Sequence, residues 1–341
     1  MTTSSSSSTA VLAPTIFQTR PYLIAYRRYF GAGKAFQRLR VEGGGAFLMT
    51  RGRTARRLEW WGAGIHDIGG AAYDSPRAAQ ELWAAIEALA HRRHGAHLAQ
   101  VPAACRFVDL AARAGWQVAP AETCPVLMLP ATWEEYVRSL GKNMREQIKR
   151  YPKRLEKQFA VEYELAQGEE AVQGALSDLF RLHGKRWRAR GQTGVLATPR
   201  RQKFHRAVCA AFANADWLRL WTLRCDGQAA CVLLSYFYGG RYSFFIGGFE
   251  PELMRWSVGT CLFAKVFQHA IAEGATEFDF LRGEEDYKYR FGAVNRDYKT
   301  LSYFQDSLRG RWLHRRIELE NAFMHRVHHA FSAAHRTARD D

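Results

Sequence analysis

One short stretch, residues 278–292, collects side chains that could do acid–base and anion-binding chemistry. Asp279 interrupts an apolar run, Gly283 ends it, and the cations Arg282 and Lys288 follow close behind. A carboxylate at the end of a strand can accept a proton from an attacking nucleophile. Cations beside it can hold a phosphate or stabilise an oxyanion. The stretch therefore predicts a site where a nucleophile loses its proton next to a bound anion.

Each of these side chains also has a structural alternative. Asp279 could instead hydrogen-bond the backbone at the strand end, and Arg282 and Lys288 could pair with the acidic run 284–286. Tyr287 could donate a proton to a leaving group or pack as an aromatic side chain. Glu284 is a reserve base. The residues themselves leave these alternatives open.

The elements before this stretch would position it. Three β-rich runs, Trp217–Cys225, Gln228–Tyr238 and Arg241–Phe249, are joined by Asp-Gly and Gly-Gly pairs, which are strong hairpin signals. A helical pattern follows over Ser257–Glu273, and a strand over Thr276–Leu281. The predicted order is three antiparallel strands, a helix and a further strand.

The same order is predicted earlier in the chain. Runs at Phe36–Glu42, Ala46–Arg51 and Ala55–Trp61 precede a helix that opens at Ser75-Pro76 and continues to about Arg93; a strand follows at Ala96–Val101. Two copies of one α/β unit are the favoured architecture. The predicted fold class is α/β (α+β), with each copy a mixed, mostly antiparallel sheet flanked by helices.

The start of the second copy's helix is a candidate phosphate-binding turn. Arg255, Ser257, Gly259 and Thr260 lie where backbone N–H groups and the helix dipole would face an anion. The alternative is an ordinary capped helix start, because a strong phosphate loop has a second glycine where Ser257 stands.

A basic helical segment separates the two copies. Thr132 and Glu135 form a capping box, an apolar stripe runs from Leu140 to Leu155, and Pro152 predicts a kink. Seven Lys and Arg side chains occupy the other face. They could contact the phosphates of an RNA or be simply solvated. The tail carries a second apolar stripe of Leu313, Ile317, Met324, Val327 and Phe331, which would either lie on an anionic membrane or fold back on the body.

Composition limits the remaining choices. The chain has 341 residues and a formal charge of +16, which predict two domains and an anionic partner. Six cysteines without a CxxC pair indicate reduced thiols, and hence a cytoplasmic protein. The alternative, through the amphipathic tail, is a peripheral location at the inner face of the membrane. No apolar run is long enough for a transmembrane helix. Histidines 91, 94 and 97, and 325, 328 and 329, lack a completing ligand, so no metal is predicted.

Several of these residues carry a resemblance to a known family. They are Trp187 with Arg190-Gly191, Gly247-Gly248-Phe249, Ser257-x-Gly259-x-x-Leu262, Gly274 and, above all, the run from Asp279 to Gly292. With them, residues 20–305 resemble the GNAT acyltransferase fold in the tandem form of FemAB-like proteins and of BioF2-like (CelD-type) acetyltransferases. The expected organisation is a disordered leader (1–19), a first GNAT-like domain (20–130), a basic connector (131–168), an acyltransferase domain (169–308) and an amphipathic tail (309–341).

The resemblance implies transfer of an acyl group to an amine or hydroxyl, in polysaccharide or cell-envelope biosynthesis. The donor would be acyl-CoA or an acyl carrier protein, or aminoacyl-tRNA in a FemAB-type transferase; Ser257 puts acetyl-CoA itself in question. Asp279 would be the base, with Tyr287 and Glu284 as further catalytic candidates. Arg255, Ser257, Gly259, Thr260, Arg282, Gly283 and Lys288 would bind the donor, and His66, Asp67 and Arg190 the glycan, peptide or small-molecule acceptor. The rival from another class is a non-catalytic basic adaptor.

Overall fold

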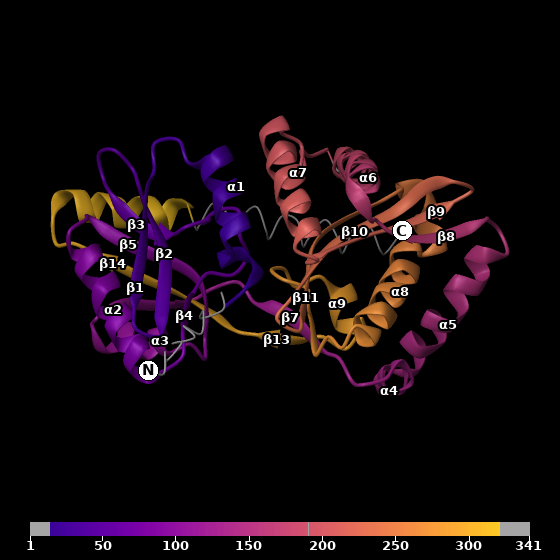
Figure 1. Ribbon diagram of the computed structural model, residues 1–341, viewed down its shortest axis with the longest axis horizontal. Helices are drawn as coiled ribbons and strands as arrows, with labels where there is room; N and C mark the ends of the chain where they lie inside the picture. The colour runs from indigo at the N-terminus through magenta and orange to yellow at the C-terminus, as the bar shows by residue number, and fades with distance from the viewer. Residues whose placement is uncertain (1–13, 190, 321–341) are drawn as a thin grey trace, which may run out of the picture.

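The computed structural model describes residues 14–189 and 191–320 and arranges them as two mixed sheets that lie side by side, each covered by helices (Figure 1). Sheet A lies in the first half of the molecule and sheet B in the second. In each sheet, one pair of neighbouring strands is parallel and the other pairs are antiparallel.

Sheet A has the strand order β1-β2-β3-β5-β14-β6, and β4 pairs with β2 beside this path. Its parallel pair is β3 and β5. Helices α2 and α3 pack their apolar sides on it. Its strands are β1 (Ala35–Val41), β2 (Gly44–Arg51), β3 (Arg57–Trp60), β4 (Ala71–Tyr73), β5 (Gly95–Pro102), β6 (Gln117–Pro120) and β14 (Tyr298–Phe304).

Sheet B has the order β13-β7-β12-β11-β10-β9-β8, and its parallel pair is β11 and β12. One face packs on α4, α5 and α8, and the other on α6 and α7. Its strands are β7 (Cys124–Met128), β8 (Val161–Leu165), β9 (Leu218–Cys225), β10 (Gln228–Tyr238), β11 (Arg241–Phe249), β12 (Glu277–Asp279) and β13 (Val294–Arg296).

The helices cover these faces and close the seam between the sheets, where α1 packs on α7 (Figure 1). Residues 308–320 form a further helix. The others are η1 (Ile16–Gln18), α1 (Arg20–Phe30), α2 (Pro76–His91), α3 (Arg106–Arg113), α4 (Trp133–Ser139), α5 (Lys142–Glu156), α6 (Gly168–Arg188), α7 (Pro199–Asn214), η2 (Pro251–Trp256), α8 (Val258–Ala272) and α9 (Asp286–Arg290). Within the described ranges, no helix is long and apolar enough to cross a membrane.

The repeated element order predicted from the sequence is present in both halves. β1, β2 and β3 are antiparallel, and α2 leads to β5, which is parallel to β3. In the same way, β9, β10 and β11 are antiparallel, and α8 leads to β12, which is parallel to β11. The capping box of Thr132 and Glu135 opens α4, and Pro152 lies inside α5.

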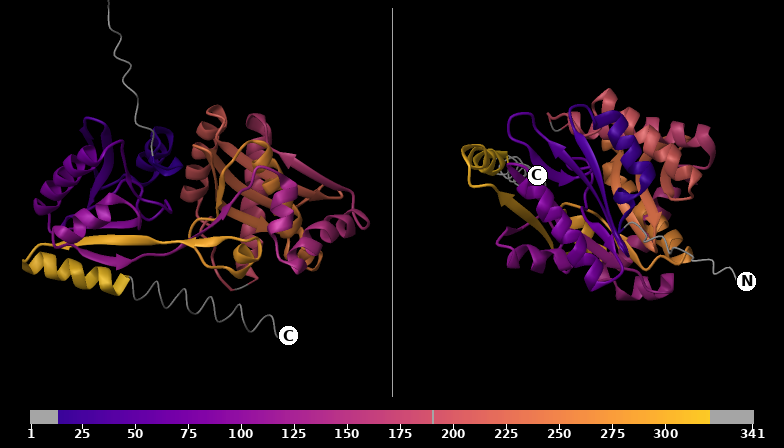
Figure 2. Two further views of the ribbon diagram at one scale, coloured as in Figure 1. Left: turned by 90° about the horizontal axis from the view of Figure 1, so that it is seen from below. Right: turned by 60° about the vertical axis from the view of Figure 1, so that its left-hand side comes forward.

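The halves exchange strands, which the expected boundaries do not include. β14 lies within the expected second domain but inserts between β5 and β6 of sheet A. β7 lies within the expected first domain but inserts between β12 and β13 of sheet B. Figure 2 shows β14 extending from the second half back into the first. Sequence ranges therefore do not separate the two sheets.

Two further boundaries differ from the expectation. The predicted leader extends to residue 19, but Ile16 and Phe17 are buried in the core, because Thr15 caps η1 and turns them inward; residues 1–13 lie outside the described part. The connector is not separate from the second half, since α5 packs on α8 and β8 completes the edge of sheet B. Leu313 and Ile317 fold back on Ala55 and Phe304, while the rest of their predicted stripe lies outside the described residues.

Candidate active site

The two parallel strands of sheet B separate near their C-terminal ends. β11 and β12 pair over only three positions, and the last pair is Ser243 with Asp279. β11 continues to Phe249 with no paired strand on that side among the described residues, and the register of β10 and β11 slips between Leu234 and Ser235. Such a bulge bends the strand away from its neighbour. Asp279 therefore stands where the sheet opens.

Asp279 is fully buried, at 0% exposure. Its Oδ1 accepts a hydrogen bond of 2.8 Å from the Leu281 N–H. Its Oδ2 has no hydrogen-bond partner among the described residues. Burial raises the pKa of Asp279 from 3.8 to about 6, against the lowering effect of that hydrogen bond. Oδ1 therefore bonds the backbone, as the structural alternative predicts, while Oδ2 remains available to accept a proton near neutral pH.

The loop after Asp279 is held in an uncommon backbone conformation. Leu281 has φ 55° and Gly283 φ 107°. Lys288 fixes this loop: its Nζ donates to the carbonyls of Phe280 (3.2 Å), Arg282 (3.0 Å) and Gly283 (2.9 Å), and pairs with Glu285 at 2.9 Å. An ammonium has three donors, and these carbonyls use all of them. The predicted role of Lys288 in binding a phosphate is therefore wrong, because the residue is buried and its donors are occupied.

Arg282 joins the two halves of the molecule. Its Nε lies 2.7 Å from Asp67 Oδ1, and its Nη1 lies 3.3 Å from Glu122 Oε1. Neither predicted role, donor binding or pairing with the acidic run 284–286, anticipates this contact. The pair brings a predicted acceptor residue of the first half beside the strained loop of the second.

His66, next to Asp67, lies buried at the same seam. Neither ring nitrogen has a hydrogen-bond partner with normal geometry among the described residues. Burial, with a smaller contribution from the Arg282 charge, lowers the pKa of His66 to about 3. The ring is therefore neutral at pH 7 and offers one donor and one acceptor.

Two further polar atoms at the seam also lack partners in the described part of the chain: Tyr22 Oη and His205 Nδ1. Aromatic contacts connect them. Tyr22 packs against Phe17, which lies 6.4 Å from the His66 ring centroid, and His205 lies 5.1 Å from Phe245. Buried polar groups normally bond to protein, water or a ligand. We call this set, together with His66 and Asp279 Oδ2, the seam polar cluster; its donors and acceptors are not used within the described part of the chain.

The remaining catalytic candidates lie elsewhere around the opening. Tyr287 packs against Phe263, with 5.7 Å between ring centroids, and belongs to the face covered by α8. Burial raises its pKa well above the ordinary value. Asp279 faces the opposite side of β12, because its neighbours Phe278 and Phe280 point to α8. Glu284 is exposed and accepts hydrogen bonds from Thr123 and Asn295, away from Asp279 Oδ2.

The predicted phosphate turn lies at the start of α8. Ser257 adopts the left-handed conformation (φ 56°, ψ 37°), its side chain does not cap the helix, and Gly259 faces open space. The first turn contains no acidic residue. Arg255 and Thr260 flank it in the chain, and Arg154 of α5 reaches it, since its Nη2 lies 2.6 Å from the Arg255 carbonyl and its guanidinium covers the Trp256 ring. Free N–H groups and cations thus meet here.

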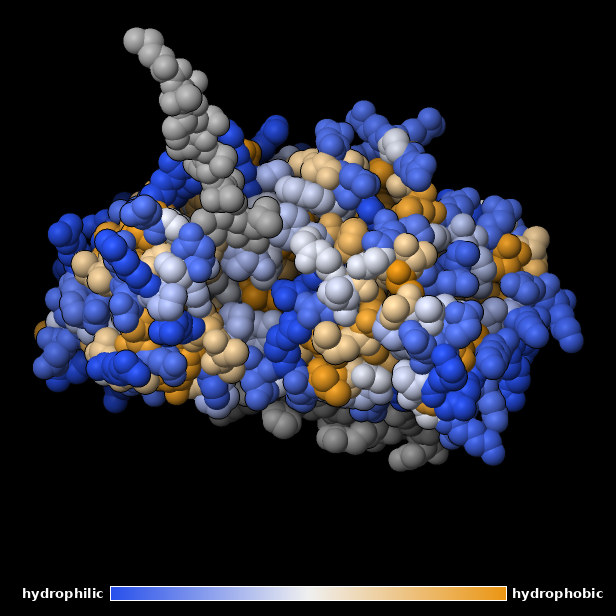
Figure 3. Space-filling view, turned by 60° about the horizontal axis from the view of Figure 1, so that its bottom comes forward, coloured by the Kyte–Doolittle hydropathy of each residue, from blue (hydrophilic) through white to orange (hydrophobic). Residues whose placement is uncertain are grey.

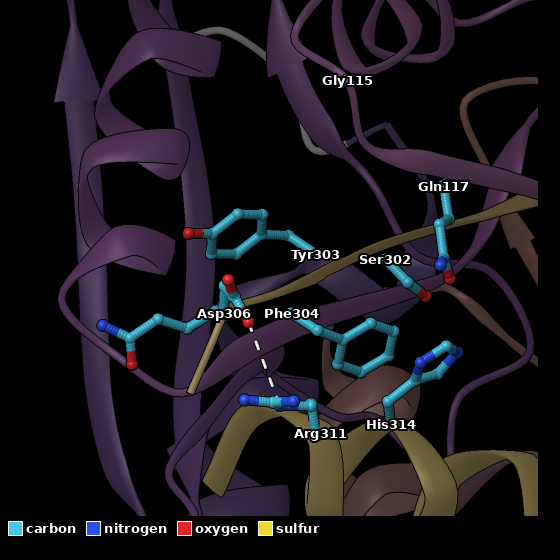
Figure 4. Close-up of a pocket in the computed structure, with 9 residues that line it drawn as sticks. Gly115, Gln117, Ser302, Tyr303, Phe304, Asp306, Arg311 and His314 are labelled. Atoms are coloured by element: carbon cyan, nitrogen blue, oxygen red, sulfur yellow. Dashed lines mark ion pairs between the residues drawn. The ribbon is translucent and has the colours of Figure 1, made fainter. Parts of the chain in front are cut away.

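One surface hollow of the molecule lies away from the candidate residues named above. A hollow of about 310 Å³ lies on sheet A beside Phe304 and His314, where Arg311 and Asp306 form an ion pair (Figure 4). Its lining does not include Asp279 or the other candidate site residues. Within residues 14–189 and 191–320, no group of three His, Cys, Asp or Glu side chains is arranged to hold a metal. Arg190, a predicted acceptor residue, lies outside the described residues.

Comparison with known proteins now defines the fold. Residues 142–289 match the family described as "Acetyltransferase (GNAT) domain". The structure of FemX is similar over 89% of this chain and 94% of its own, with a TM-score of 0.66 and 12% identity. This chain has a tandem GNAT-like fold.

Other similar structures support the same fold. One is the C-terminal domain of a putative lysylphosphatidylglycerol synthetase from Agrobacterium fabrum, with 12% identity, coverage of 85% of this chain and 89% of that one, and a TM-score of 0.57. Another is L-PGS from Bacillus licheniformis, with 12% identity, coverage of 85% and 93%, and a TM-score of 0.58. No curated protein matches the sequence. At these identities the likeness concerns the fold alone.

The matched GNAT region contains the second half of the candidate site and leaves out the first. It includes α5, the start of α8, Asp279, Lys288 and Tyr287, but not His66 or Asp67. The tandem GNAT-like fold supplies those from its other unit. Tyr22 and His205 could not be predicted from the sequence, because each is a single polar residue in an ordinary helix pattern and only the fold brings them together.

Proposed function

We propose that this protein transfers an acyl group from a carrier to an amine or hydroxyl, with Asp279 as the base. The donor's carrier would lie along the start of α8, and its acyl group would enter the sheet where β11 and β12 separate. The acceptor would lie at the seam polar cluster. The resemblance favours an acceptor from polysaccharide or cell-envelope biosynthesis and acyl-CoA as donor.

One observation carries this proposal: the unpartnered Oδ2 of Asp279, fully buried at the opening of sheet B. A buried carboxylate without a partner is costly to keep. Its raised pKa, about 6, suits a group that takes a proton at neutral pH. The match of residues 142–289 to a GNAT domain supports acyl transfer as the reaction that uses it.

The reaction follows from these positions. The acceptor nitrogen or oxygen attacks the carbonyl carbon of the thioester or ester, and its proton passes to Asp279 Oδ2. The new C–N or C–O bond forms as the bond to the carrier breaks. The carrier leaves as a thiolate or alkoxide and takes up a proton from water. Tyr287 packs on the α8 face of β12, opposite Asp279, so we assign it no part in this step. Neutral His66 can hold the acceptor by a hydrogen bond without competing for its proton.

The test is the Asp279→Asn variant. We expect acyl transfer to fall by at least about 100-fold, because the base is lost while the Leu281 N–H keeps an acceptor. Donor binding, measured by calorimetry with acyl-CoA, should change little. The control Glu284→Gln alters a neighbouring exposed carboxylate and should leave the rate nearly unchanged. An Asp279→Asn enzyme with the wild-type rate would remove Asp279 from the mechanism, and absence of transfer from every donor in the wild type would favour the adaptor.

A second candidate, transfer from aminoacyl-tRNA, is favoured by the continuity of the basic face. The cations of α5 reach the start of α8 through Arg154. The helix is about 22 Å long, more than the phosphates of one CoA molecule would occupy. In Figure 3, hydrophilic side chains crowd the end of the molecule that carries α4 and α5. The exposed cations of α5 are Lys142, Arg145, Lys149, Arg150, Lys153 and Arg154.

The two donors can be told apart by one variant pair. Lys149→Gln with Lys153→Gln removes charge from α5 at a distance from the helix start. If the donor is aminoacyl-tRNA, its KM should rise severalfold and activity should disappear after ribonuclease treatment. If the donor is acyl-CoA, both treatments should leave the rate unchanged.

A further inference from the structure

The helix over residues 308–320 has two apolar faces. Its inner face packs Leu313 and Ile317 on Ala55 and Phe304, and Glu320 pairs with the buried Arg57 at 3.3 Å. These contacts fix the helix over β3, β5 and β14, on the face of sheet A opposite α2 and α3. Its rotation about its own axis is therefore determined by the body of the protein.

The outer face carries large apolar side chains in water. Leu308 is 83% exposed, Trp312 52% and Leu319 71%. At 100° per residue these three fall within about 40° of one another around the helix axis. Arginines lie on both sides of this outer stripe: Arg309, Arg311, Arg315 and Arg316. Arg316 also covers the Trp312 ring at 5.6 Å.

Two of the three acidic side chains near the outer stripe are paired with arginines. Glu320 pairs with both Arg316 and Arg57, and Glu318 lies 3.4 Å from His314, a contact that is an ion pair only when the histidine is protonated. Asp306, in the turn before the helix, lies 3.9 Å from Arg311. For Arg309 and Arg315, no carboxylate lies within ion-pair distance among the described residues. The net charge of this face is positive.

We propose that the outer stripe binds the surface of an anionic lipid bilayer, with the helix lying flat on it. Leucine and tryptophan side chains gain free energy by entering the headgroup and acyl boundary, and flanking arginines attract lipid phosphates. A second copy of this chain fits less well, because it would bring four arginines against four others on a protein of charge +16. The inner face keeps the body attached while the outer one is buried in lipid.

The experiment is co-sedimentation of the full chain with phosphatidylcholine vesicles, with and without phosphatidylglycerol. We expect binding to the anionic vesicles only, weakened by salt. Replacing Leu308, Trp312 and Leu319 by Ser should weaken it at least about tenfold, because the buried apolar area is lost. Arg309→Gln with Arg315→Gln should weaken it severalfold while the apolar stripe remains.

Matched controls distinguish binding through the outer stripe from binding through other exposed apolar side chains or through the overall positive charge. Ile24→Ser with Val195→Ser removes exposed apolar side chains elsewhere, and Lys149→Gln with Lys153→Gln removes charge from α5. Both should bind vesicles as the wild type does. The proposal is overturned if the serine triple variant binds normally, if only the α5 variant loses binding, or if light scattering shows a dimer that the triple variant converts to a monomer.

Discussion

At the residue scale, Asp279 should make the stability of the protein depend on pH. Its folded pKa, about 6, exceeds the ordinary 3.8, so between these values the folded state binds more protons than the unfolded state. The free energy of unfolding should therefore fall as pH rises through this window, by about 3 kcal/mol in total. The loss should persist above pH 6.

The Asp279→Asn variant isolates this effect in urea unfolding curves. It has no charge to bury, so it should be more stable than the wild type at pH 8 and gain little at pH 4. The variant should thus gain stability while it loses activity. A residue that only supported the fold would lose stability when replaced, so the two roles can be told apart. Equal stability of both proteins at every pH would contradict the burial of the charge.

Lys288 should behave as a positioning residue for the loop that follows Asp279. Lys288→Met would leave three carbonyls and Glu285 without their partner, so we expect a loss of at least about 2 kcal/mol in unfolding free energy. Lys149→Met, on the exposed face of α5, is the matched control and should change stability little. Where the Lys288 variant folds, the KM for acyl-CoA should stay near the wild-type value, because no donor of Lys288 is free for a phosphate.

What the sequence reveals at this scale depends on how local the chemistry is. The start of α8 could be predicted, because Arg255, Ser257 and Gly259 are neighbours in the chain. The contact of Arg282 with Asp67 could not, because 215 positions separate them. The role of Lys288 was mistaken for a related reason: its partners are backbone carbonyls, which carry no residue signature.

At the element scale, the packing of α6 on β11 depends on one glycine. A Cβ added at Gly248 would lie 2.7 Å from the His183 backbone nitrogen and 3.0 Å from Leu182 Cβ. The helix backbone would have to move, so Gly248→Ala should cost about 1–3 kcal/mol. Gly174→Ala, in the same helix but facing open space, should instead stabilise by up to about 1 kcal/mol. Urea midpoints of the two variants should shift in opposite directions.

The elements themselves were predictable where turns define them. The bounds of β10 and β11 agree with the sequence prediction, because Asp226-Gly227 and Gly239-Gly240 mark both turns. β8 was overlooked inside the connector, although Val161–Leu165 alternates between half-buried and exposed positions as an edge strand should. The exchanged strands β7 and β14 are short, and nothing local distinguishes which sheet each joins.

At the scale of the whole molecule, strand exchange should make the two sheets unfold together. Leu301 of β14 is fully buried in sheet A, yet its strand follows the second half in sequence. Leu127 of β7 is buried in sheet B, yet its strand follows the first half. Each exchanged strand is joined by the chain to one half and by hydrogen bonds to the sheet of the other half, so its release disturbs both sheets. We therefore expect the two units that flank the seam polar cluster not to open independently.

Two reciprocal variants test this coupling. Leu301→Ala and Leu127→Ala should each cost about 2–5 kcal/mol, because each leaves a cavity in one sheet. Hydrogen exchange measured by mass spectrometry on peptides from β2 and β10 would report the two sheets separately. We expect each variant to lower the opening free energy of both peptides by similar amounts, since one cooperative unit contains both sheets. If each variant affected only the peptide of its own sheet, the halves would be independent domains, and the seam could open as a hinge around the acceptor.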